Sequence, residues 1–324
     1  MLSDRFGRSI DYLRVSVTDR CDLRCTYCMP KDFKGFEDPP DWLSFEEIER
    51  VVGAFARLGT RRVRLTGGEP LTRRGLPQLA ASLAALPGVA DLSLSTNATR
   101  LARHAVALRA AGVRRLNVSL DALDRQAMCS ITGRDSLPSI LEGLAAARVA
   151  GFDPIKINMV AMRGVNDSQI DAMVEFCIEQ RFMLRLIEVM PMGASGQDAS
   201  FMDLAPVQRR LKERFGLQPQ ALELGGGPAR YLCTPDGEVS IGFITPLSQH
   251  FCATCNRVRL SVDGTLYLCL GQEEKFELRP LLRGGASDAE LEQAIRAAIE
   301  LKPQQHDFGR QPEKIIRFMS QTGG

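Results

Sequence analysis

The stretch that decides the fold is residues 12–28, YLRVSVTDRCDLRCTYC. Its first six residues alternate as a β-strand does, with Arg14 and Ser16 on one face and aliphatic side chains on the other. Three cysteines follow directly with C-x3-C-x2-C spacing: Cys21, Cys25 and Cys28. Thiolates are soft ligands that favour metals such as zinc and iron–sulfur clusters. The stretch therefore predicts a β-strand that leads into a metal-binding loop.

The same strand pattern recurs along the first two-thirds of the chain. Strands are expected at residues 12–17, 62–66, 91–95, 114–120, 154–160 and 183–189, and helical patterns follow them. Ser44 and Glu47 form a capping box that marks the start of one such helix. Six β-then-α units predict a parallel sheet, either a barrel or a doubly wound sheet.

Five of these strands carry polar side chains on one face, whereas buried parallel strands are usually apolar throughout. The polar sets are Arg14 and Ser16, Arg64 and Thr66, Ser93 and Ser95, Asn117 and Ser119, and Lys156 and Asn158. A closed eight-stranded barrel fills its interior with apolar side chains. For a single strand, the polar residues could simply lie at strand ends near solvent. Agreement among five strands instead predicts an incomplete (β/α)6 barrel, a partial TIM barrel whose polar lumen holds a ligand.

Composition changes near residue 192, where a loop, residues 192–200, begins. A helix is expected at residues 203–214 and another at 289–298, with short strands near 229–233, 239–244, 258–262 and 265–268. We therefore divide the chain into a partial barrel, residues 1–200, and an α+β region, residues 201–324, that closes the open barrel.

A second cysteine group lies in this C-terminal region. Cys252 and Cys255 are followed after thirteen residues by Cys269, and the run Asn256-Arg257-Val258-Arg259 stands between them. Two guanidinium groups on one side of a short strand suit an anion, since the arginine fork matches phosphate oxygens. On spacing alone, His250 could complete a structural zinc site with these cysteines.

Bulk properties exclude several classes of protein. Lys and Arg number 41 against 39 Asp and Glu, so no overall basic field indicates nucleic acid. No apolar run approaches the ~18–20 residues of a membrane span, and the charged N-terminus does not read as a signal peptide. We expect a cytoplasmic protein, whose nine cysteines favour metal over disulfides. The three histidines are not spaced for zinc or for histidine-led catalysis.

The N-terminal CxxxCxYC run and the TGGEP loop at residues 66–70 resemble the radical S-adenosylmethionine superfamily. The resemblance implies a [4Fe–4S] cluster held by Cys21, Cys25 and Cys28, with a fourth iron open to S-adenosylmethionine. It places Tyr27 near the adenosyl group and the backbone of the GGEP loop near the methionyl amino group. A zinc site or a redox thiol group is the alternative for these cysteines.

The C-terminal CxxCNRxR…C set and the terminal Gly323-Gly324 narrow the resemblance to the GTP 3′,8-cyclase family. This family performs the first step of molybdenum cofactor biosynthesis. The resemblance implies a lyase with a second [4Fe–4S] cluster on Cys252, Cys255 and Cys269. A 5′-deoxyadenosyl radical would abstract H3′ of GTP, and the C3′–C8 bond would form, giving (8S)-3′,8-cyclo-7,8-dihydroguanosine 5′-triphosphate. The terminal glycines would reach toward the active site.

The family's contacts can be transferred by position. Those to S-adenosylmethionine fall on Tyr27, Gly68, Ser119 and Met190. Those to GTP fall on Arg14, Arg64, Ser95, Lys156, Arg257, Val258 and Arg259, of which Arg14, Arg257 and Arg259 are the expected catalytic residues. Ser95 departs from the family, which more often has threonine there, but it keeps a hydroxyl group. The remaining cysteines, Cys129, Cys177 and Cys233, are interpreted as ordinary packing residues.

The resemblance also implies partners: a flavodoxin- or ferredoxin-type electron donor and a downstream cyclic pyranopterin monophosphate synthase, for a monomer or homodimer. Neither nucleic acid nor membrane is expected. Two other functions remain open from the sequence. One is a radical S-adenosylmethionine enzyme that modifies peptides with an auxiliary cluster, and the other is a non-catalytic, zinc-stabilised binding module.

Overall fold

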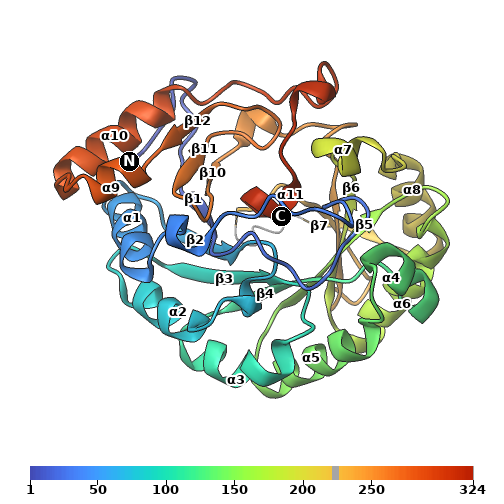
Figure 1. The fold of residues 1–324 in the computed structure, drawn as a ribbon. Coiled ribbons are helices and arrows are strands. Elements are labelled where there is room, and N and C mark those ends of the chain that lie inside the picture. Colours follow the sequence, from blue (N-terminus) through green and yellow to red (C-terminus); the bar gives the residue numbers. More distant parts are fainter. Residues whose placement is uncertain (221–225, 324) are drawn as a thin grey trace.

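The computed structural model describes residues 1–220 and 226–323, and its centre is one curved sheet wrapped by helices (Figure 1). Six strands follow one another in parallel, each paired with the next along the chain. They are β1 (Tyr12–Ser16), β2 (Arg62–Thr66), β3 (Asp91–Thr96), β4 (Arg115–Ser119), β5 (Ile155–Ala161) and β6 (Met183–Glu188). The predicted partial barrel of six β/α units is confirmed.

Helices cover the outer face of this sheet (Figure 1). They are α1 (Phe45–Arg57), α2 (Leu76–Ala85), α3 (Leu101–Ala110), α4 (Arg125–Thr132), α5 (Leu137–Val149) and α6 (Ile170–Gln180). The predicted capping box opens α1: the Glu47 amide donates to the Ser44 hydroxyl at 3.1 Å, and the Ser44 amide donates to the Glu47 carboxylate at 2.7 Å. The aliphatic strand faces, such as Leu13 and Val15, are fully buried in the core.

The C-terminal region adds strands to both edges of the sheet, which the sequence analysis did not foresee. On one edge β10 (Arg257–Leu260) pairs in parallel with β1, and β11 (Thr265–Tyr267) and β12 (Lys275–Glu277) follow antiparallel. On the other edge β9 (Ser240–Ile244) pairs in parallel with β6, followed by antiparallel β8 (Arg230–Cys233) and β7 (Gln218–Gln220). The parallel run therefore contains eight strands rather than six.

The sheet ends at β12 and β7, so the barrel stays open. The two predicted C-terminal helices correspond to α8 (Leu204–Phe215) and α10 (Asp288–Glu300). Shorter helices are α7 (Gly193–Gln197), α9 (Arg279–Arg283) and α11 (Met319–Thr322), and α11 lies at the centre of the barrel view in Figure 1. The division at residue 200 remains a prediction, since the strands on its two sides belong to one sheet.

The register of the strands places the polar side chains side by side on the inner face. Arg14 is paired with Arg259 of β10 on one side and with Arg64 of β2 on the other. Further round the sheet, Asn117 is paired with Ser95 and with Lys156. Because side chains alternate between the two faces of a strand, this register builds a continuous polar inner wall.

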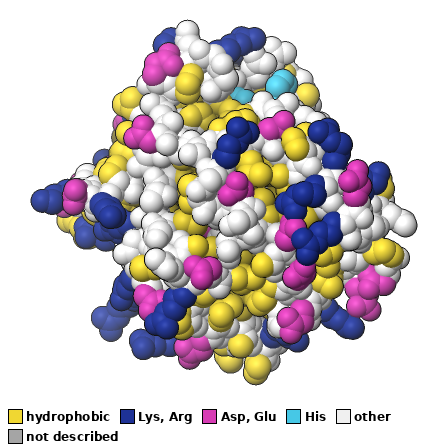
Figure 2. Space-filling model, turned by 90° about the vertical axis from the view of Figure 1, so that its right-hand side faces the viewer, with side chains coloured by type: hydrophobic (Ala, Val, Ile, Leu, Met, Phe, Trp, Pro, Cys, Tyr) yellow, Lys and Arg dark blue, Asp and Glu magenta, His cyan; other side chains and the backbone are white. Residues whose placement is uncertain are grey.

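The outer surface has no single sign of charge in the view of Figure 2, where basic and acidic side chains are interspersed. This agrees with the formal net charge of +2. Within residues 1–220 and 226–323, no helix combines the length and the apolar character that crossing a bilayer demands.

Candidate active site

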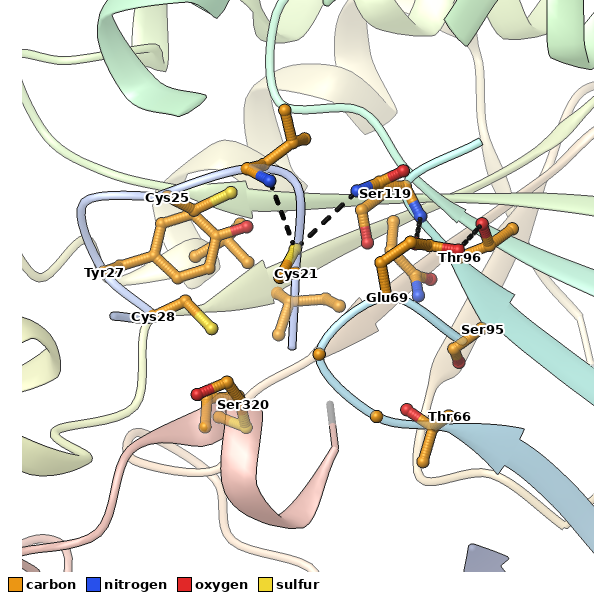
Figure 3. A pocket seen from close by; sticks show the side chains of 18 of the residues that line it. Cys21, Cys25, Tyr27, Cys28, Thr66, Glu69, Ser95, Thr96, Ser119 and Ser320 are labelled. Carbon is orange, nitrogen blue, oxygen red and sulfur yellow. Dashed lines mark hydrogen bonds between the residues drawn. The ribbon is translucent and has the colours of Figure 1, made fainter. Parts of the chain in front are cut away.

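The first cysteine group lies in the loop after β1, at the carboxyl ends of the parallel strands. Cys21, Cys25 and Cys28 line one pocket together with the TGGE loop after β2 (Figure 3). The loop is fixed to the end of α4, since the Arg24 amide donates to the Thr132 carbonyl at 2.9 Å. Parallel sheets commonly bind ligands at this end, so the loop is in the expected place.

Burial raises the pKa of all three thiols. The pKa values of Cys21 and Cys28 rise to about 12, and that of Cys25 rises well above its ordinary value. Neighbouring negative groups add to this: Glu69 acts on Cys21, and Asp121 acts on Cys25 and Cys28. The thiolate form that binds metal would therefore need the positive charge of the metal itself.

The two glycines of the TGGE loop serve a close approach within the chain. A Cβ atom on Gly67 or Gly68 would overlap the carbonyl oxygens of Thr18 or Arg20. The Gly68 amide donates to the Thr18 carbonyl at 2.7 Å, and the Glu69 amide donates to the Arg20 carbonyl at 2.8 Å. The sequence analysis placed the backbone of this loop near a ligand; the structure shows in addition that the two glycines, which line the pocket, let this loop pack against the cysteine loop.

Glu69 connects this loop to the end of β3, a role that the sequence analysis did not assign. Its carboxylate accepts from the Thr96 hydroxyl and from the Asn97 amide, each at 2.6 Å (Figure 3). The Asn97 side-chain amide in turn lies 3.8 Å from the Cys21 sulfur. Through these hydrogen bonds, the Glu69 side chain fixes the geometry of the pocket wall. Burial raises the pKa of Glu69 to about 7.

Tyr27 is positioned by a second buried carboxylate. Its hydroxyl donates to Asp121 at 2.8 Å, and the other oxygen of Asp121 accepts from the Val160 amide, also at 2.8 Å. Burial raises the pKa of Asp121 to about 6. Tyr27, Gly68, Ser119 and Met190 all line the first pocket, so the residues expected to contact S-adenosylmethionine are brought together.

The second cysteine group lines another pocket. Cys252 begins a single 3₁₀ turn, Cys255 precedes β10, and Cys269 follows β11. These cysteines share the pocket with the guanidinium groups of Arg14, Arg64, Arg185, Arg257 and Arg259. Burial alone would raise the pKa of Cys255, but the charges of Lys302 and Arg257 outweigh it and lower the pKa to about 7.

The two pockets are contiguous. Asn158 of β5, Ile187 of β6 and Met190 just beyond β6 line both of them. The two cysteine groups thus line adjoining pockets that share part of their wall.

The basic residues of the lumen are crowded, and several of their buried nitrogens have no hydrogen-bond partner among the described residues. Burial, followed by the charges of Arg259 and Arg64, lowers the pKa of Arg14 well below its usual value. Burial lowers the pKa of Arg64 and Arg259 to about 10 and that of Lys156 to about 6. Buried nitrogens without a hydrogen-bond partner include Nε of Arg14, Arg64, Arg185, Arg257 and Arg259 and Nζ of Lys156. Buried cations with unused donors are costly, so this wall is built for an anion.

Three of the predicted GTP contacts do not line the second pocket. Lys156 is buried on the inner face but lines neither pocket, and the Val258 side chain lies in the apolar core between two inward arginines. Ser95 lines the first pocket rather than the second. A contact from Val258 would therefore come from its backbone.

The C-terminal tail enters the first pocket. Met319 and Ser320 of α11 line this pocket. The hydrogen bond from the Ser320 amide favours the thiolate form of Cys28 and so partly offsets the burial that raises the pKa of this thiol. Gly323 packs so closely on Thr66 that a Cβ atom there would overlap the threonine side chain. The expectation that the tail reaches the site holds for Gly323, whereas Gly324 lies outside the described residues.

The sequence analysis missed several residues of the site. Arg185 of β6 lines the second pocket, but Met183 and Ile187 share its face and interrupt the polar pattern. Glu69, Asp121 and Lys302 are buried polar residues whose partners are distant in sequence, so local spacing gave no signal. The one usable signal was Arg185 itself, a single charged residue in the otherwise apolar stretch 183–187.

The donor sets fit iron–sulfur clusters. Each pocket presents three thiols that lie near one another. Cys28 and Cys21 both raise the pKa of Cys25, and Cys255 and Cys252 both raise that of Cys269. Thiolate trios are the usual ligands of clusters that keep one iron open. Within the described parts of the chain, no three His, Cys, Asp or Glu side chains converge as the ligands of a single ion would. Cys177 is buried in the core, and Cys129 and Cys233 line neither pocket.

Two family models match the chain. Residues 15–177 match the radical SAM superfamily, and residues 182–308 match the family Molybdenum Cofactor Synthesis C. Curated relatives are similar over the full length. The GTP 3′,8-cyclase of Paracoccus denitrificans is 47% identical, with 100% of this chain and 96% of the relative covered. The GTP 3′,8-cyclase 2 of Pseudomonas aeruginosa is 46% identical over 100% of this chain and 98% of the relative.

Among solved structures, the chain resembles Streptococcus suis SuiB bound to S-adenosylmethionine. The TM-score is 0.58 at 16% identity, with 90% of this chain and 66% of that chain covered. At this identity the likeness concerns the fold alone, and it agrees with a radical SAM partial barrel.

Proposed function

This chain belongs to the radical SAM superfamily and, within it, to the GTP 3′,8-cyclases, and from this membership we propose which of its residues carry the reaction. It catalyses the first step of molybdenum cofactor biosynthesis, in which GTP is cyclised with the help of S-adenosylmethionine and [4Fe–4S] clusters. The full-length relatives at 47% and 46% identity decide against a peptide-modifying enzyme or a zinc-stabilised module.

We assign the first pocket to S-adenosylmethionine. Cys21, Cys25 and Cys28 would hold the first cluster, and the bound cluster and S-adenosylmethionine supply the 5′-deoxyadenosyl radical that ordinary side chains cannot provide. Tyr27 contributes a flat wall held in place by Asp121 at 2.8 Å. Gly68, Ser119 and Met190 complete the wall, and Met190 also faces the second pocket.

We assign the second pocket to GTP. Cys252, Cys255 and Cys269 would hold the second cluster, next to which the guanine base would lie. Arg14, Arg257 and Arg259 bind and orient the nucleotide, together with Arg64, Ser95, Lys156 and Val258. In a lumen sheltered from water, preorganised cations act more strongly than they would in bulk solvent.

The single observation that carries this assignment is the shared lining of the two pockets by Asn158, Ile187 and Met190. A radical made in the first pocket must reach a carbon–hydrogen bond held in the second without meeting solvent. Contiguous pockets at the inner face of one sheet allow this, and a site sheltered from water would suppress side reactions of the radical.

The proposal extends to the partners, the oligomeric state and the cellular location of the protein. A flavodoxin- or ferredoxin-type protein would donate electrons, a cyclic pyranopterin monophosphate synthase would take the product, and the chain would act as a monomer or homodimer. We place it in the cytoplasm, because six of its nine cysteines would have to stay reduced as cluster ligands. The partial barrel would comprise residues 1–200, and residues 201–324 would carry the second cluster.

The test is an anaerobic incubation of the purified protein with GTP, S-adenosylmethionine and a chemical reductant, followed by product analysis. We expect 5′-deoxyadenosine and the cyclised nucleotide to form together, and ATP in place of GTP to give no cyclised product. About eight irons per chain should accompany the activity if both cysteine trios hold cubic clusters. Four irons per chain, or turnover without GTP consumption, would contradict the assignment of the second pocket.

A further inference from the structure

Three buried cations from distant parts of the chain hold the backbone of the second cysteine group. Arg8 donates to the Cys252 carbonyl at 2.9 Å, and Arg317 donates to the Cys269 carbonyl at 2.9 Å. The Lys302 ammonium donates to the carbonyl of Leu268, the residue before Cys269, and to the Arg257 carbonyl at 3.1 Å. Each cation thus anchors a segment that carries a cysteine.

Two of the three cations are neutralised by carboxylates. Nε of Arg8 lies 2.6 Å from Asp4, and Nη1 of Arg317 lies 2.7 Å from Glu273. Among the residues that the structure describes, no Asp or Glu lies within ion-pair distance of Lys302. Lys302 is nevertheless only 1% exposed. Lys302 therefore differs from Arg8 and Arg317 in being a buried cation that no carboxylate neutralises.

A buried ammonium without a counter-charge is costly, even when carbonyl groups accept its hydrogen bonds. Lys302 lines the second pocket, where the nearby groups that can become anionic are the thiols of Cys252, Cys255 and Cys269. Its ammonium is held beside these thiols by the carbonyl of Leu268, next to Cys269, and by the carbonyl of Arg257, two residues from Cys255. Three thiolates bound to a cluster would supply the missing negative charge.

We propose that Lys302 is the fixed counter-charge of the second cluster, a positioning residue that stabilises its reduced state. The inference rests on the proposed ligation by Cys252, Cys255 and Cys269. Adding one electron to a cluster makes it more negative, and a nearby fixed cation favours that state, so its reduction potential rises. In the first cysteine group, Arg24 donates to the Cys21 carbonyl at 2.7 Å, but it is only partly buried and does not line the pocket, whereas the carboxylate of Glu69 does.

The proposal separates two roles that Lys302 could have. A residue that only anchors carbonyl groups needs donors, whereas a counter-charge needs its positive charge. Lys302→Gln keeps N–H donors and removes the charge, and Lys302→Met removes both. Lys302→Arg keeps the charge and changes the hydrogen-bond geometry. The matched control is Lys275→Gln, because Lys275 is exposed on β12, where it lies 4.0 Å from Glu277.

The experiment is a redox titration of the reconstituted full-length protein, followed by electron paramagnetic resonance. To isolate the second cluster, each variant is also made in a chain whose Cys21, Cys25 and Cys28 are replaced by alanine. Lys302→Gln and Lys302→Met should disfavour reduction of the second cluster at least tenfold, a shift of about 59 mV to more negative potential for a one-electron couple. Lys302→Arg and Lys275→Gln should leave the potential near the wild-type value.

Selective loss of the second cluster from Lys302→Gln, with the first cluster and the circular dichroism spectrum intact, would also support a counter-charge. A wild-type potential in Lys302→Gln would overturn the proposal and leave Lys302 as a carbonyl anchor. If Lys302→Gln and Lys302→Met yield no folded protein, Lys302→Arg decides, because a tenfold shift despite the retained charge contradicts it. Absence of a second cluster in the wild-type protein would instead refute the proposed ligation itself.

Discussion

The two cysteine groups present the same number of thiols to one lumen, yet their electrostatic surroundings are opposite. Around the first group, burial and the carboxylates Glu69 and Asp121 hold the thiol pKa values high, at about 12 for Cys21 and Cys28. In the second group, burial still raises the pKa of Cys252 and Cys269, but the charges of Lys302 and then Arg257 overcome burial at Cys255 and lower its pKa to about 7. The spacing of the cysteines gives no hint of this contrast.

The contrast shows that side chains from other elements, and not the cysteine motif, set the field at each site. Negative neighbours disfavour an added electron, so the first site suits a cluster that must be a strong reductant. Positive neighbours favour anions, so the second site suits a polyphosphate as well as thiolates. Replacing a cysteine or a basic residue at one site tests whether the two sites differ in this way.

The largest effect should come from removing one ligand from each group in turn. Cys25→Ala should abolish S-adenosylmethionine cleavage, because the first cluster is lost and no other group in the lumen can make the radical. Cys269→Ala should retain some cleavage to 5′-deoxyadenosine but form no cyclised nucleotide. Iron content, 5′-deoxyadenosine and cyclised product are measured in the same anaerobic assay.

Each of these variants should lose only the cluster that its cysteine holds. The pair therefore tests whether the two clusters assemble and act independently. Cys177→Ala is the control, because Cys177 lies in the core of α6 and away from both pockets. If Cys269→Ala abolished 5′-deoxyadenosine formation as completely as Cys25→Ala, the two sites could not be assigned separate roles.

The next largest effect concerns the arginines of β10. Arg257→Ala and Arg259→Ala should each weaken GTP binding by about 10- to 100-fold, since a charge-assisted hydrogen bond contributes roughly 1.5–3 kcal/mol. S-adenosylmethionine binding, measured by equilibrium dialysis on the same preparations, should change little. Equal losses for both ligands would mean that the β10 edge had become disordered, and unchanged GTP affinity would remove these arginines from the site.

Arg185 should behave as a weaker member of the same wall. It lies on β6, paired with Asn158 of β5, and its Nε has no hydrogen-bond partner among the described residues. Arg185→Ala should raise the KM for GTP by about tenfold through the loss of one ionic contact. Arg181→Ala is the control, because Arg181 is exposed and pairs with Glu238 on the surface. A KM equal to that of this control would exclude Arg185 from nucleotide binding.

Much of the barrel could be predicted from sequence because its signals are local. The Ser44–Glu47 capping box starts α1 as expected, and the alternation in residues 12–17 gave both the strand β1 and its polar face. The three cysteines after β1 were identifiable because all of them lie in one short loop. Periodicity and spacing of this kind need no knowledge of distant parts of the chain.

What could not be predicted depends on pairings between distant residues. Tyr12 of β1 is paired with Arg257 of β10, and no pattern within either strand predicts this pairing. Lys302 stands between Leu301 and Pro303, where a lysine reads as an exposed residue, yet it is buried under the second cysteine group. The burial of such residues arises only when the sheet is assembled, because their partners are distant in sequence. The electrostatic field that distinguishes the two cysteine sites comes from these buried charges.

The smallest effect expected is a pH dependence that belongs to the second site alone. Burial, followed by the charges of Arg185 and Arg115, lowers the pKa of Lys156 to about 6, so the free site holds a largely neutral lysine at neutral pH. A bound triphosphate would favour the charged form and raise this pKa, so binding above pH 6 takes up a proton. The contribution of Lys156 to GTP affinity should be full below pH 6 and decline above it, by at most tenfold per pH unit.

Calorimetry from pH 6 to pH 8, in two buffers of different ionisation enthalpy, measures this proton uptake directly. Lys156→Met should abolish the uptake assigned to the lysine, and the difference between the two proteins cancels the titration of GTP itself. S-adenosylmethionine binding should show no difference between them, because the charges that act on Lys156 include those of Arg185 and Arg64, which line the second pocket and not the first. An identical proton uptake in both proteins would mean that Lys156 stays neutral in the complex, and that the arginines alone give the second site its positive field.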